Sequence, residues 1–381
     1  MLLGLGEIII LLYLPTLRKE ARMQSKIYIN GIHSIAPQAC FDNGFFDNTL
    51  DQTPKIFLEV IPPKYTDYIP GKKLRRMTKV IRWGLIGAQK AMEDAHVNQI
   101  DSILVGTGNG NISDTQKFLN AILDNGEKML VPTSFVQSTN NTVAGNIALM
   151  LKNTGYNMTY THHSTAFEMC LLDALMQFED KEANAILVGA TDEITQENVL
   201  LRNQCALWIK EAINPLDIFK IPTKAAQMGE SASFFVLSNK KQQNTYAQLI
   251  DVDLFYQKTT DGISNRIHHF LQKNNIREDE VDLILGGFNG VKKYDQTLET
   301  LLKSLFPSSL IAAFKQFVGE HPTASAFGMW MASQILSGKN IPKEIYYKHI
   351  PKEKKEIKTI LIIQKAYLSE EDYGMILLRR I

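Results

Sequence analysis

A weak internal repeat constrains the fold of this chain more than any other feature of its sequence. Residues 102–110 have the sequence SILVGTGNG, and residues 282–290, 180 positions later, have the sequence DLILGGFNG. Both are short apolar runs that end in a glycine-rich turn, which is typical of a buried β-strand. Each follows a segment with a helical pattern, at 79–95 and at 262–274. The same two elements are therefore expected twice along the chain.

A second echo supports this duplication. The glycines of GNIALMLKNTG bracket an alanine-rich helix candidate at 145–155, and those of GMWMASQILSG bracket another at 328–338, an offset of 183 residues. Two echoes in the same order and at nearly the same offset indicate a duplicated α/β unit. We therefore expect two similar halves, at 23–240 and 241–381, that pack together with helices between their sheets.

Other apolar runs alternate with helical segments in the same way. The run AILVGATDE at 185–193 is apolar over most of its length, as expected of a strand buried on both faces. Such alternation predicts a layered α/β fold with largely buried sheets. Further strands are expected at 232–238, 247–255, 359–364 and 375–380, and further helices at 165–178, 297–305 and 323–337.

Composition excludes several classes of protein. The chain has 41 Lys and Arg against 40 Asp and Glu, a formal net charge of +1, whereas nucleic-acid binders usually carry a clear basic excess. Hydrophobic residues (45%) and charged residues (21%) are close to the globular average, which argues against disorder and against a multi-span membrane protein. Cys40, Cys170 and Cys205 are far apart, so no disulfide framework or zinc site is expected. We expect a cytoplasmic location, with no cofactor, metal or nucleic acid.

The first 22 residues require a separate interpretation. Residues 1–16, MLLGLGEIIILLYLPT, are apolar but shorter than a membrane span, which needs about 20 residues, and Glu7 interrupts them. No positively charged segment precedes them, as a signal peptide requires. Met23 opens a segment in which a first strand is expected. We interpret residues 1–22 as an upstream mis-start or a loose extension; the alternatives are a membrane or interface anchor, or packing against a partner.

Six short motifs follow one another between about residue 26 and the C-terminus. They are NNTVAGNIALMLKNTG at 140–155, LVGATDE at 187–193, PLD at 215–217, MGESASFFVLS at 228–238, VDLILGGFNG at 281–290 and FKQFVGEHPTASAFG at 314–328. In this order they resemble the motifs of the β-ketoacyl synthases of the thiolase superfamily. The resemblance implies the five-layer αβαβα thiolase fold, which is itself an internal duplication, in agreement with the repeat.

The resemblance also implies a site. In this family a cysteine at a helix N-terminus, where the helix dipole favours the thiolate, takes an acyl chain from a carrier thioester. Two histidines, or His and Asn, then stabilise the enolate formed from a malonyl group. In YTHHSTAFEMCLLDALM, residues 160–176, counting back nine positions from Asp173 places Ser164 at the cysteine position. Cys170 is the alternative nucleophile, but its place on an apolar helical stripe favours a buried structural role.

The other site positions can be matched one by one. Asn289 aligns with the first histidine; it can donate a hydrogen bond to an enolate oxygen, or it can simply form a turn before Gly290. His321 aligns with the second histidine, or it begins a helix before Pro322. Lys315 matches the lysine of the family, but it precedes His321 by six residues, whereas the family spacing is five.

Two segments depart from the family. The glycine loop that supplies part of the oxyanion hole is replaced by KAYLSEEDYG, which retains only Gly374. The acidic residues at 370–372 are expected to face solvent. His162 and His163 directly precede Ser164, which is not a feature of the family. A Ser–His pair could form an acyl-serine, although adjacent strand residues point to opposite faces.

These matches lead to three hypotheses. In the first, the chain resembles the non-condensing chain length factors, pairs with a cysteine-bearing ketosynthase through a strand within 157–163, and shapes the acyl tunnel of that partner. The resemblance is strongest to divergent ketosynthase-like proteins of aryl-polyene and flexirubin-type pigment clusters, whose corresponding segment also has the pattern H-x-x-x-A-F-E-x-x-L-L-D-A. A homodimer is the alternative assembly.

The second hypothesis is an active 3-oxoacyl-carrier-protein synthase or acyltransferase that uses Ser164 or no covalent intermediate, with His321 and Asn289 as enolate stabilisers. The third is a non-catalytic scaffold that holds an acyl chain or an acyl carrier protein. Carrier proteins are acidic, so the scaffold needs a basic patch near the tunnel mouth. The candidate lysines, which are otherwise ordinary solvated surface residues, are Lys292, Lys293, Lys352, Lys354, Lys355 and Lys358.

Overall fold

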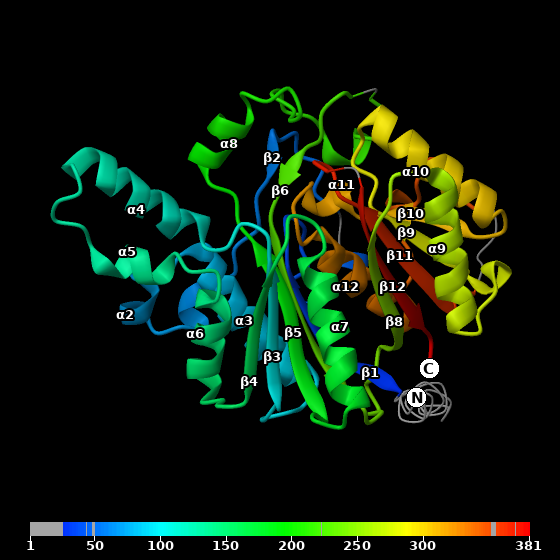
Figure 1. Cartoon of the computed structure of the whole chain (residues 1–381), viewed down its shortest axis with the longest axis horizontal. Coiled ribbons are helices and arrows are strands. Elements are labelled where there is room, and N and C mark those ends of the chain that lie inside the picture. Colours follow the sequence, from blue (N-terminus) through cyan, green and yellow to red (C-terminus); the bar gives the residue numbers. More distant parts are fainter. Residues whose placement is uncertain (1–25, 43, 48–49, 222, 352–355, 370) are drawn as a thin grey trace, which may run out of the picture.

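The computed structural model describes residues 26–42, 44–47, 50–221, 223–351, 356–369 and 371–381 (Figure 1). The expectations for residues 1–22, for Lys352, Lys354 and Lys355, and for residue 370 lie outside these ranges. Within them, no helix is both long enough and apolar enough to cross a membrane.

The described strands form one large continuous sheet, in the order β10-β9-β11-β12-β8-β1-β7-β5-β3-β4, and a small second one. The N-terminal half contributes β1 (Ile27–Ile35), β3 (Ser102–Thr107), β4 (Tyr156–Thr161), β5 (Ala185–Asp192) and β7 (Ser231–Ser238). The C-terminal half contributes β8 (Ala247–Tyr256), β9 (Leu283–Gly286), β10 (Leu310–Ala313), β11 (Thr359–Lys365) and β12 (Asp372–Arg379). The beginning of β1 pairs with β8 and joins the halves. The second sheet consists of β2 (Phe57–Leu58) and β6 (Met228–Gly229).

The two halves have the same topology. In each, one strand, β3 or β9, lies parallel to both of its neighbours, and the sheet then continues through two antiparallel strands. The order β4-β3-β5-β7-β1 thus repeats as β10-β9-β11-β12-β8. The echo between 102–110 and 282–290 reflects this duplication, because β3 and β9 occupy equivalent places.

The second sequence echo does not join equivalent elements. Helix α6 (Thr142–Leu151) lies between β3 and β4, whereas α12 (Ala324–Leu336) lies between β10 and β11, where the N-terminal half has α7 (Ala166–Glu179). Helix α12 therefore corresponds to α7. Gly145 and Gly328 also lie inside their helices. The prediction that these two glycines begin the helices was wrong, because residues 142–144 and 324–327 before them are already helical.

Helices and sheets alternate in layers. Helix α3 (Lys79–Asp94) packs with α6 over the outer face of the N-terminal half, and α9 (Thr260–Lys273) and α10 (Lys292–Leu305) cover the outer face of the C-terminal half. Helices α7 and α12 lie between the halves, since α7 contacts β3, β5 and β8 and α12 contacts β7, β1 and β11. Every residue of α12 is buried, as expected of a helix that is apolar on all sides. This is the predicted five-layer αβαβα arrangement.

Some elements were not predicted. Helices α4 (Ile112–Asn125) and α5 (Pro132–Gln137) form an arm that projects from the N-terminal half (Figure 1). The side chain of Asn111 caps α4, and Gly126 ends it with φ +56°. The edge strand β10 was also missed. The remaining helices are α2 (Gly71–Leu74), α8 (Gln196–Arg202) and α11 (Lys315–Val318).

Candidate functional site

Ser164 lies where the two halves meet. It follows β4, immediately precedes the first turn of α7, and is buried. Gln364, on β11 of the C-terminal half, donates a side-chain N–H to the Ser164 carbonyl. The position predicted for the nucleophile is thus at a helix N-terminus and in contact with both halves of the chain.

His162 holds the Ser164 turn that leads into α7. Its Nδ1 accepts hydrogen bonds from the backbone N–H groups of Ser164 (3.3 Å) and Thr165 (3.1 Å), and it lies 2.9 Å from Thr165 Oγ1. Ser164 Oγ is 3.5 Å from the same nitrogen. Burial, and then the neighbouring His163, lower the pKa of His162. A nitrogen that accepts backbone N–H groups carries no proton, and its lone pair is already engaged. It is therefore poorly placed to take a proton from Ser164.

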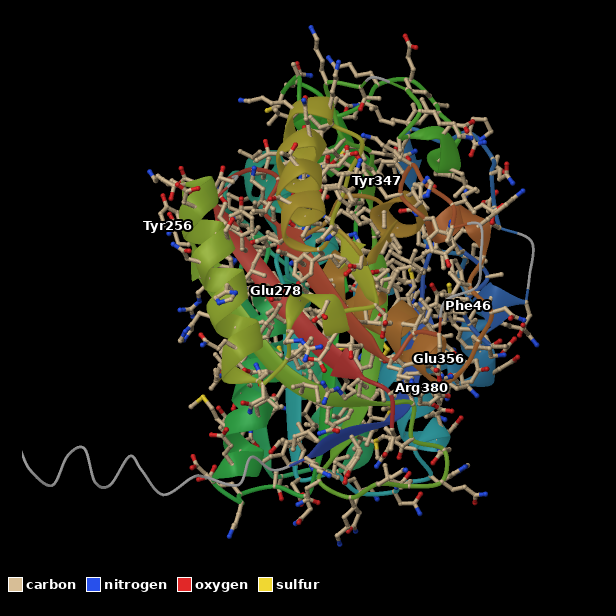
Figure 2. The ribbon with its side chains drawn as sticks, turned by 90° about the vertical axis from the view of Figure 1, so that its right-hand side faces the viewer. Phe46, Tyr256, Glu278, Tyr347, Glu356 and Arg380 are labelled. Atoms are coloured by element: carbon tan, nitrogen blue, oxygen red, sulfur yellow. The ribbon has the colours of Figure 1, made fainter. Side chains whose placement is uncertain are left out.

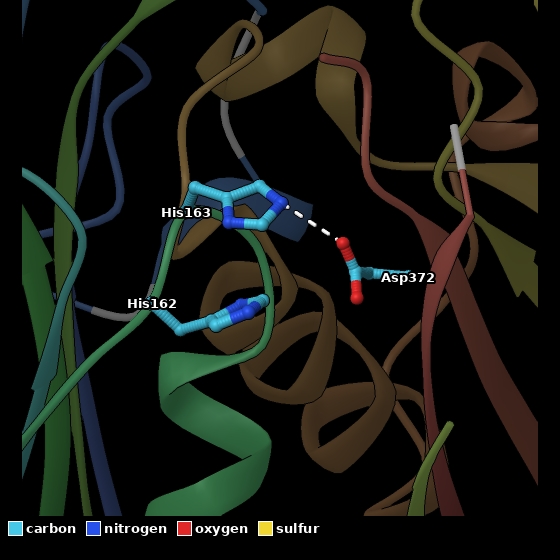
Figure 3. A group of neighbouring side chains, drawn as sticks. All are labelled: His162, His163 and Asp372. Atoms are coloured by element: carbon cyan, nitrogen blue, oxygen red, sulfur yellow. Dashed lines mark hydrogen bonds and ion pairs between the residues drawn. The ribbon is translucent and has the colours of Figure 1, made fainter. Parts of the chain in front are cut away.

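His163 fastens this turn to the C-terminal half. Its Nε2 is 2.9 Å from Asp372 Oδ2 at the start of β12, as Figure 3 shows. Ser369 Oγ donates to the same carboxylate oxygen at 2.6 Å. Asp372 is only partly exposed, so the expectation that residues 370–372 face solvent is wrong for this residue. The charged Asp372 side chain therefore lies in the segment that is rich in glycine in the related family.

Lys315, Glu320 and Asn289 form a buried polar cluster. Lys315 Nζ, on α11, lies 2.8 Å from Oε1 and 2.7 Å from Oε2 of Glu320, and Asn289 Nδ2 donates to Oε2 at 2.9 Å. All three residues are buried, so the ammonium and the carboxylate neutralise each other away from water. The structure thus brings together two of the predicted residues, Lys315 and Asn289, through a third that was not predicted.

The spacing of the motif could have identified Glu320. The family lysine precedes its histidine by five residues, and the residue five positions after Lys315 is Glu320, followed directly by His321. The backbone sets its direction, because Gly319 has φ +72°. A Cβ atom on Gly229 of β6 would lie 1.8 Å from the last carbonyl oxygen of α11. Only glycine therefore allows β6 to approach the turn that carries Glu320.

His321 belongs to a separate network. Its Nε2 is 2.8 Å from Ser231 Oγ on β7, and its Nδ1 makes no hydrogen bond with any described residue. Burial, supported by the charge of Lys315, lowers the pKa of His321 to about 3, so the imidazole is neutral. His321 and Asn289 share no hydrogen-bond partner, so the two predicted enolate stabilisers are held by different side chains.

Asn289 also forms the expected turn. Its backbone N–H and that of Gly290 donate to the two Asp295 oxygens at 3.0 Å and 2.9 Å, and its Oδ1 accepts the Val291 N–H at 3.1 Å. Gly290 has φ +88°, a conformation that favours glycine. Burial raises the pKa of Asp295 to about 7. The turn role and the contact with Glu320 therefore coexist in one side chain.

A buried carboxyl group lies on the same helix as the Ser164 turn. Glu168, in the first turn of α7, is fully buried, and neither of its oxygens makes a well-formed hydrogen bond. Burial raises its pKa to about 7, although Ser325 and Gln364 act in the opposite direction. A Cβ atom on Gly374 would lie 2.7 Å from Glu168 Oε1. The one glycine retained in the C-terminal loop thus makes room for this carboxyl group.

A cleft of about 1050 Å³ begins beside the Asn289 turn. Val291 lines it, as do three lysines, Lys224, Lys292 and Lys293. Figure 1 shows α9 and α10, which contribute most of its other walls, side by side on the outer face. Most of the further lining side chains are apolar or carry hydroxyl groups, among them Thr260, Ser264, Thr297, Leu301 and Tyr367, and Asp261 and Gln296 line the cleft as well. Such a cleft suits a ligand with an anionic end and an apolar body.

Sequence comparisons find relatives of part of the chain. Residues 62–243 match the family model described as β-ketoacyl synthase, N-terminal domain. Among curated proteins, the chloroplastic 3-oxoacyl-[acyl-carrier-protein] synthase I of Arabidopsis thaliana is 24% identical over 134 residues. That match covers 33% of this chain and only 28% of the length of the relative.

Solved structures extend the likeness to both halves. The ishigamide ketosynthase/chain length factor has a TM-score of 0.77 at 16% identity. A β-ketoacyl synthase from Burkholderia phymatum has a TM-score of 0.76 at 12% identity, and a type II polyketide synthase ketosynthase in complex with its acyl carrier protein has 0.76 at 14%. Each match covers 94% of this chain and 100% of the other. At such low identity the likeness is one of fold.

Proposed function

From the premise that this chain is a β-ketoacyl synthase-like protein of the thiolase superfamily, we propose that it serves acyl chain elongation as a non-condensing subunit, similar to a chain length factor. In this role it pairs in the cytoplasm with a ketosynthase that carries the nucleophilic cysteine. The pattern H-x-x-x-A-F-E-x-x-L-L-D-A at the Ser164 turn supports aryl-polyene or flexirubin-type pigments as the product class.

The buried contact between Lys315 and Glu320 is the main observation that supports this proposal. Decarboxylation of a malonyl group leaves an enolate, which needs hydrogen-bond donors near its oxygen. An ionised carboxylate only accepts hydrogen bonds, and its charge repels an enolate. Glu320 stands at the family spacing from Lys315 and also engages the amide of Asn289. Two side-chain donors of the predicted site, the Lys315 ammonium and the Asn289 amide, are therefore bound to a carboxylate.

The surroundings of Ser164 support the same function. A serine hydroxyl needs an adjacent base to become a nucleophile. The nearest imidazole nitrogen, His162 Nδ1, is 3.5 Å from Ser164 Oγ and already accepts two backbone N–H groups. The alternative function, an active synthase that uses Ser164 with His321 and Asn289, would need a free base beside Ser164 and an Asn289 amide that is not already bound to Glu320.

The free edge of β4 supports the proposed pairing. β4 is the last strand of the large sheet, and one side of it has no partner strand within the described chain. Exposed apolar side chains lie on it and on the helices beside it; they are Tyr156, Met158, Leu149, Leu172 and Met176. An unpaired strand with apolar neighbours is a surface that a second chain can cover. We propose a ketosynthase of the same fold as that chain, with a homodimer as the alternative.

The lysines beside the cleft support a contact with an acyl carrier protein. Lys292 and Lys293 are the first two residues of α10, and both line the cleft together with Lys224. Carrier proteins are acidic, so three lysines around an opening can orient one by charge. Lys358 does not line this cleft and is paired with Glu356 at 3.1 Å. A scaffold that binds carrier protein without a ketosynthase partner would use the same surface.

Intact-mass spectrometry tests the proposed function. The purified chain is incubated with acyl- and malonyl-carrier protein, alone and with a co-expressed cysteine-bearing ketosynthase. We expect no covalent adduct and no malonyl-dependent extension by the chain alone, and a stable complex that changes the product length of the ketosynthase. A stable acyl adduct on Ser164, or extension by the chain alone, would reject the non-condensing role. Carrier binding without any ketosynthase complex would favour the scaffold.

A further inference from the structure

Three side chains from the two halves converge at the surface beside Ser164. His162 and His163 begin the segment that leads from β4 to α7, and Asp372 begins β12. One ligand atom of each of the three lies within 4.8 Å of the others. Figure 3 shows the two imidazole rings one above the other, with the carboxylate facing them. The His163 side chain is 44% exposed, so an ion from solvent can reach the group.

We propose that His162, His163 and Asp372 form a binding site for one divalent transition-metal ion, with Zn²⁺ as the probe. Two imidazoles and one carboxylate are a ligand set that Zn²⁺ and similar late first-row ions accept, and three protein ligands leave one position open. His163 Nε2 and Asp372 Oδ2 are 2.9 Å apart. Two ligand atoms of one tetrahedral ion lie a few tenths of an ångström farther apart, so only a small movement is needed. The metal would replace the proton that these two atoms share.

The neighbouring residues can orient the ligands. Ser369 Oγ donates to Asp372 Oδ2 at 2.6 Å and so orients the carboxylate oxygen that faces His163. A metal-bound histidine usually donates its other ring N–H to an acceptor. Thr165 Oγ1, 2.9 Å from His162 Nδ1, is such an acceptor if the metal takes Nε2. Both orienting partners are therefore hydroxyl groups.

Metal binding competes with the hydrogen bonds by which His162 holds the Ser164 turn. In the metal-free chain Nδ1 accepts the Ser164 and Thr165 N–H groups. With a metal on Nε2, Nδ1 carries a proton, so these two N–H groups lose their acceptor. We therefore expect affinity below that of a dedicated structural zinc site, and a rearranged Ser164 turn in the metal-bound form. The ion would also link the two halves of the chain directly.

Calorimetric titration of the full chain with Zn²⁺, after removal of any histidine tag, tests the site. We expect saturable binding of one ion per chain. His163→Gln and Asp372→Asn should each weaken Zn²⁺ binding about tenfold or more. Ser369→Ala should weaken Zn²⁺ binding about tenfold, the effect typical of a residue that orients a metal ligand. His268→Gln is the matched control, because His268 Nδ1 also lies 2.5 Å from a carboxylate, that of Glu278, without a third ligand.

Co²⁺ gives a second readout that does not depend on binding heat. Visible absorption typical of four-coordinate Co²⁺ should appear in the wild type and in His268→Gln, and it should be lost in His163→Gln and Asp372→Asn. Circular dichroism verifies that the variants fold, and two independent ligand variants remain informative if one fails. Absence of saturable Zn²⁺ binding, or equal binding by wild type and both ligand variants, would overturn the proposal. This result is independent of whether the chain condenses acyl groups.

Discussion

Lys315 and Glu320 form a buried ion pair, with Nζ 2.7 Å from Oε2, and Asn289 donates to the same oxygen. Asn289 was expected to stabilise an enolate together with His321, but its side-chain amide donates to the Glu320 carboxylate. Figure 2 shows the side chains that fill the space between the helices and strands of the described chain. Since neither charge is exposed, each depends on the other for its solvation, and this dependence can be measured.

We predict that breaking the pair is far more costly than removing it. Lys315→Met or Glu320→Gln alone should lower the free energy of unfolding by about 3–5 kcal/mol, because each leaves a buried group without its partner. The double variant should lose less than the sum of the two. Urea unfolding measures all three. Lys220→Met, at an exposed pair with Asp217, is the control, with an expected loss below about 1 kcal/mol. Additive losses in the double variant would contradict the dependence.

A second prediction separates acyl transfer from condensation. Ser164→Cys should become acylated by acyl-carrier protein, because the α7 N-terminus favours a thiolate, yet it should not extend the chain while Glu320 is present. Because Cys205 is exposed, it is replaced by serine both in the Ser164→Cys protein and in the protein that retains Ser164. Burial raises the pKa of the Cys40 and Cys170 thiols, which keeps them inert. Intact mass detects the adduct, and malonyl-dependent product detects condensation. Extension by the Ser164→Cys protein would show that Glu320 does not block the site.

Glu168 should make the stability of the chain depend on pH. Burial raises its pKa from 4.5 to about 7, so the folded state binds the proton more tightly than the unfolded state. The free energy of unfolding should therefore fall as pH rises from about 4.5 to about 7, by about 3 kcal/mol from this group. Glu168→Gln should remove that part of the decline and be the more stable protein at pH 8.

Urea unfolding at pH 5, 6, 7 and 8 measures this difference. Asp295, whose pKa burial also raises to about 7, is present in both proteins and adds the same slope to each. Glu59→Gln, at an exposed position, controls for the loss of one carboxyl group. Parallel stability curves for the wild type and Glu168→Gln would mean that Glu168 is ionised in the folded chain at all these pH values.

The fold was predictable where a buried element has an uninterrupted run of apolar residues. The strands at 102–107 and 283–286 are apolar runs, and α12 is apolar on every side, so each can be recognised from its own residues. The α4–α5 arm was missed, although Phe118, Leu119, Ile122 and Leu123 recur at helical spacing along α4. The thiolase-like arrangement of the layers was correctly predicted from the motif order and the repeat.

The site was predictable only in part, because its groups come from distant segments. Gln364 reaches Ser164 across 200 positions, and Asp372 reaches His163 across 209, which no local pattern records. The direction of Glu320 depends on the left-handed backbone of the preceding glycine. One sequence therefore provides the candidate residues, whereas their partners follow from the way the two halves pack.

A final prediction concerns the cleft. Lys292→Glu and Lys293→Glu should each weaken binding of an acidic acyl carrier protein by about tenfold at low ionic strength, because charges at the rim of an interface steer the encounter. The effect should shrink as salt is raised, since the screening length falls from about 10 Å at 0.1 M to about 3 Å at 1 M. Lys343→Glu, an exposed lysine that does not line the cleft, is the matched control and should bind as wild type does. Equal affinities for all four proteins at low salt would exclude this cleft as the carrier site and would leave β4 as the surface to examine for partner contacts.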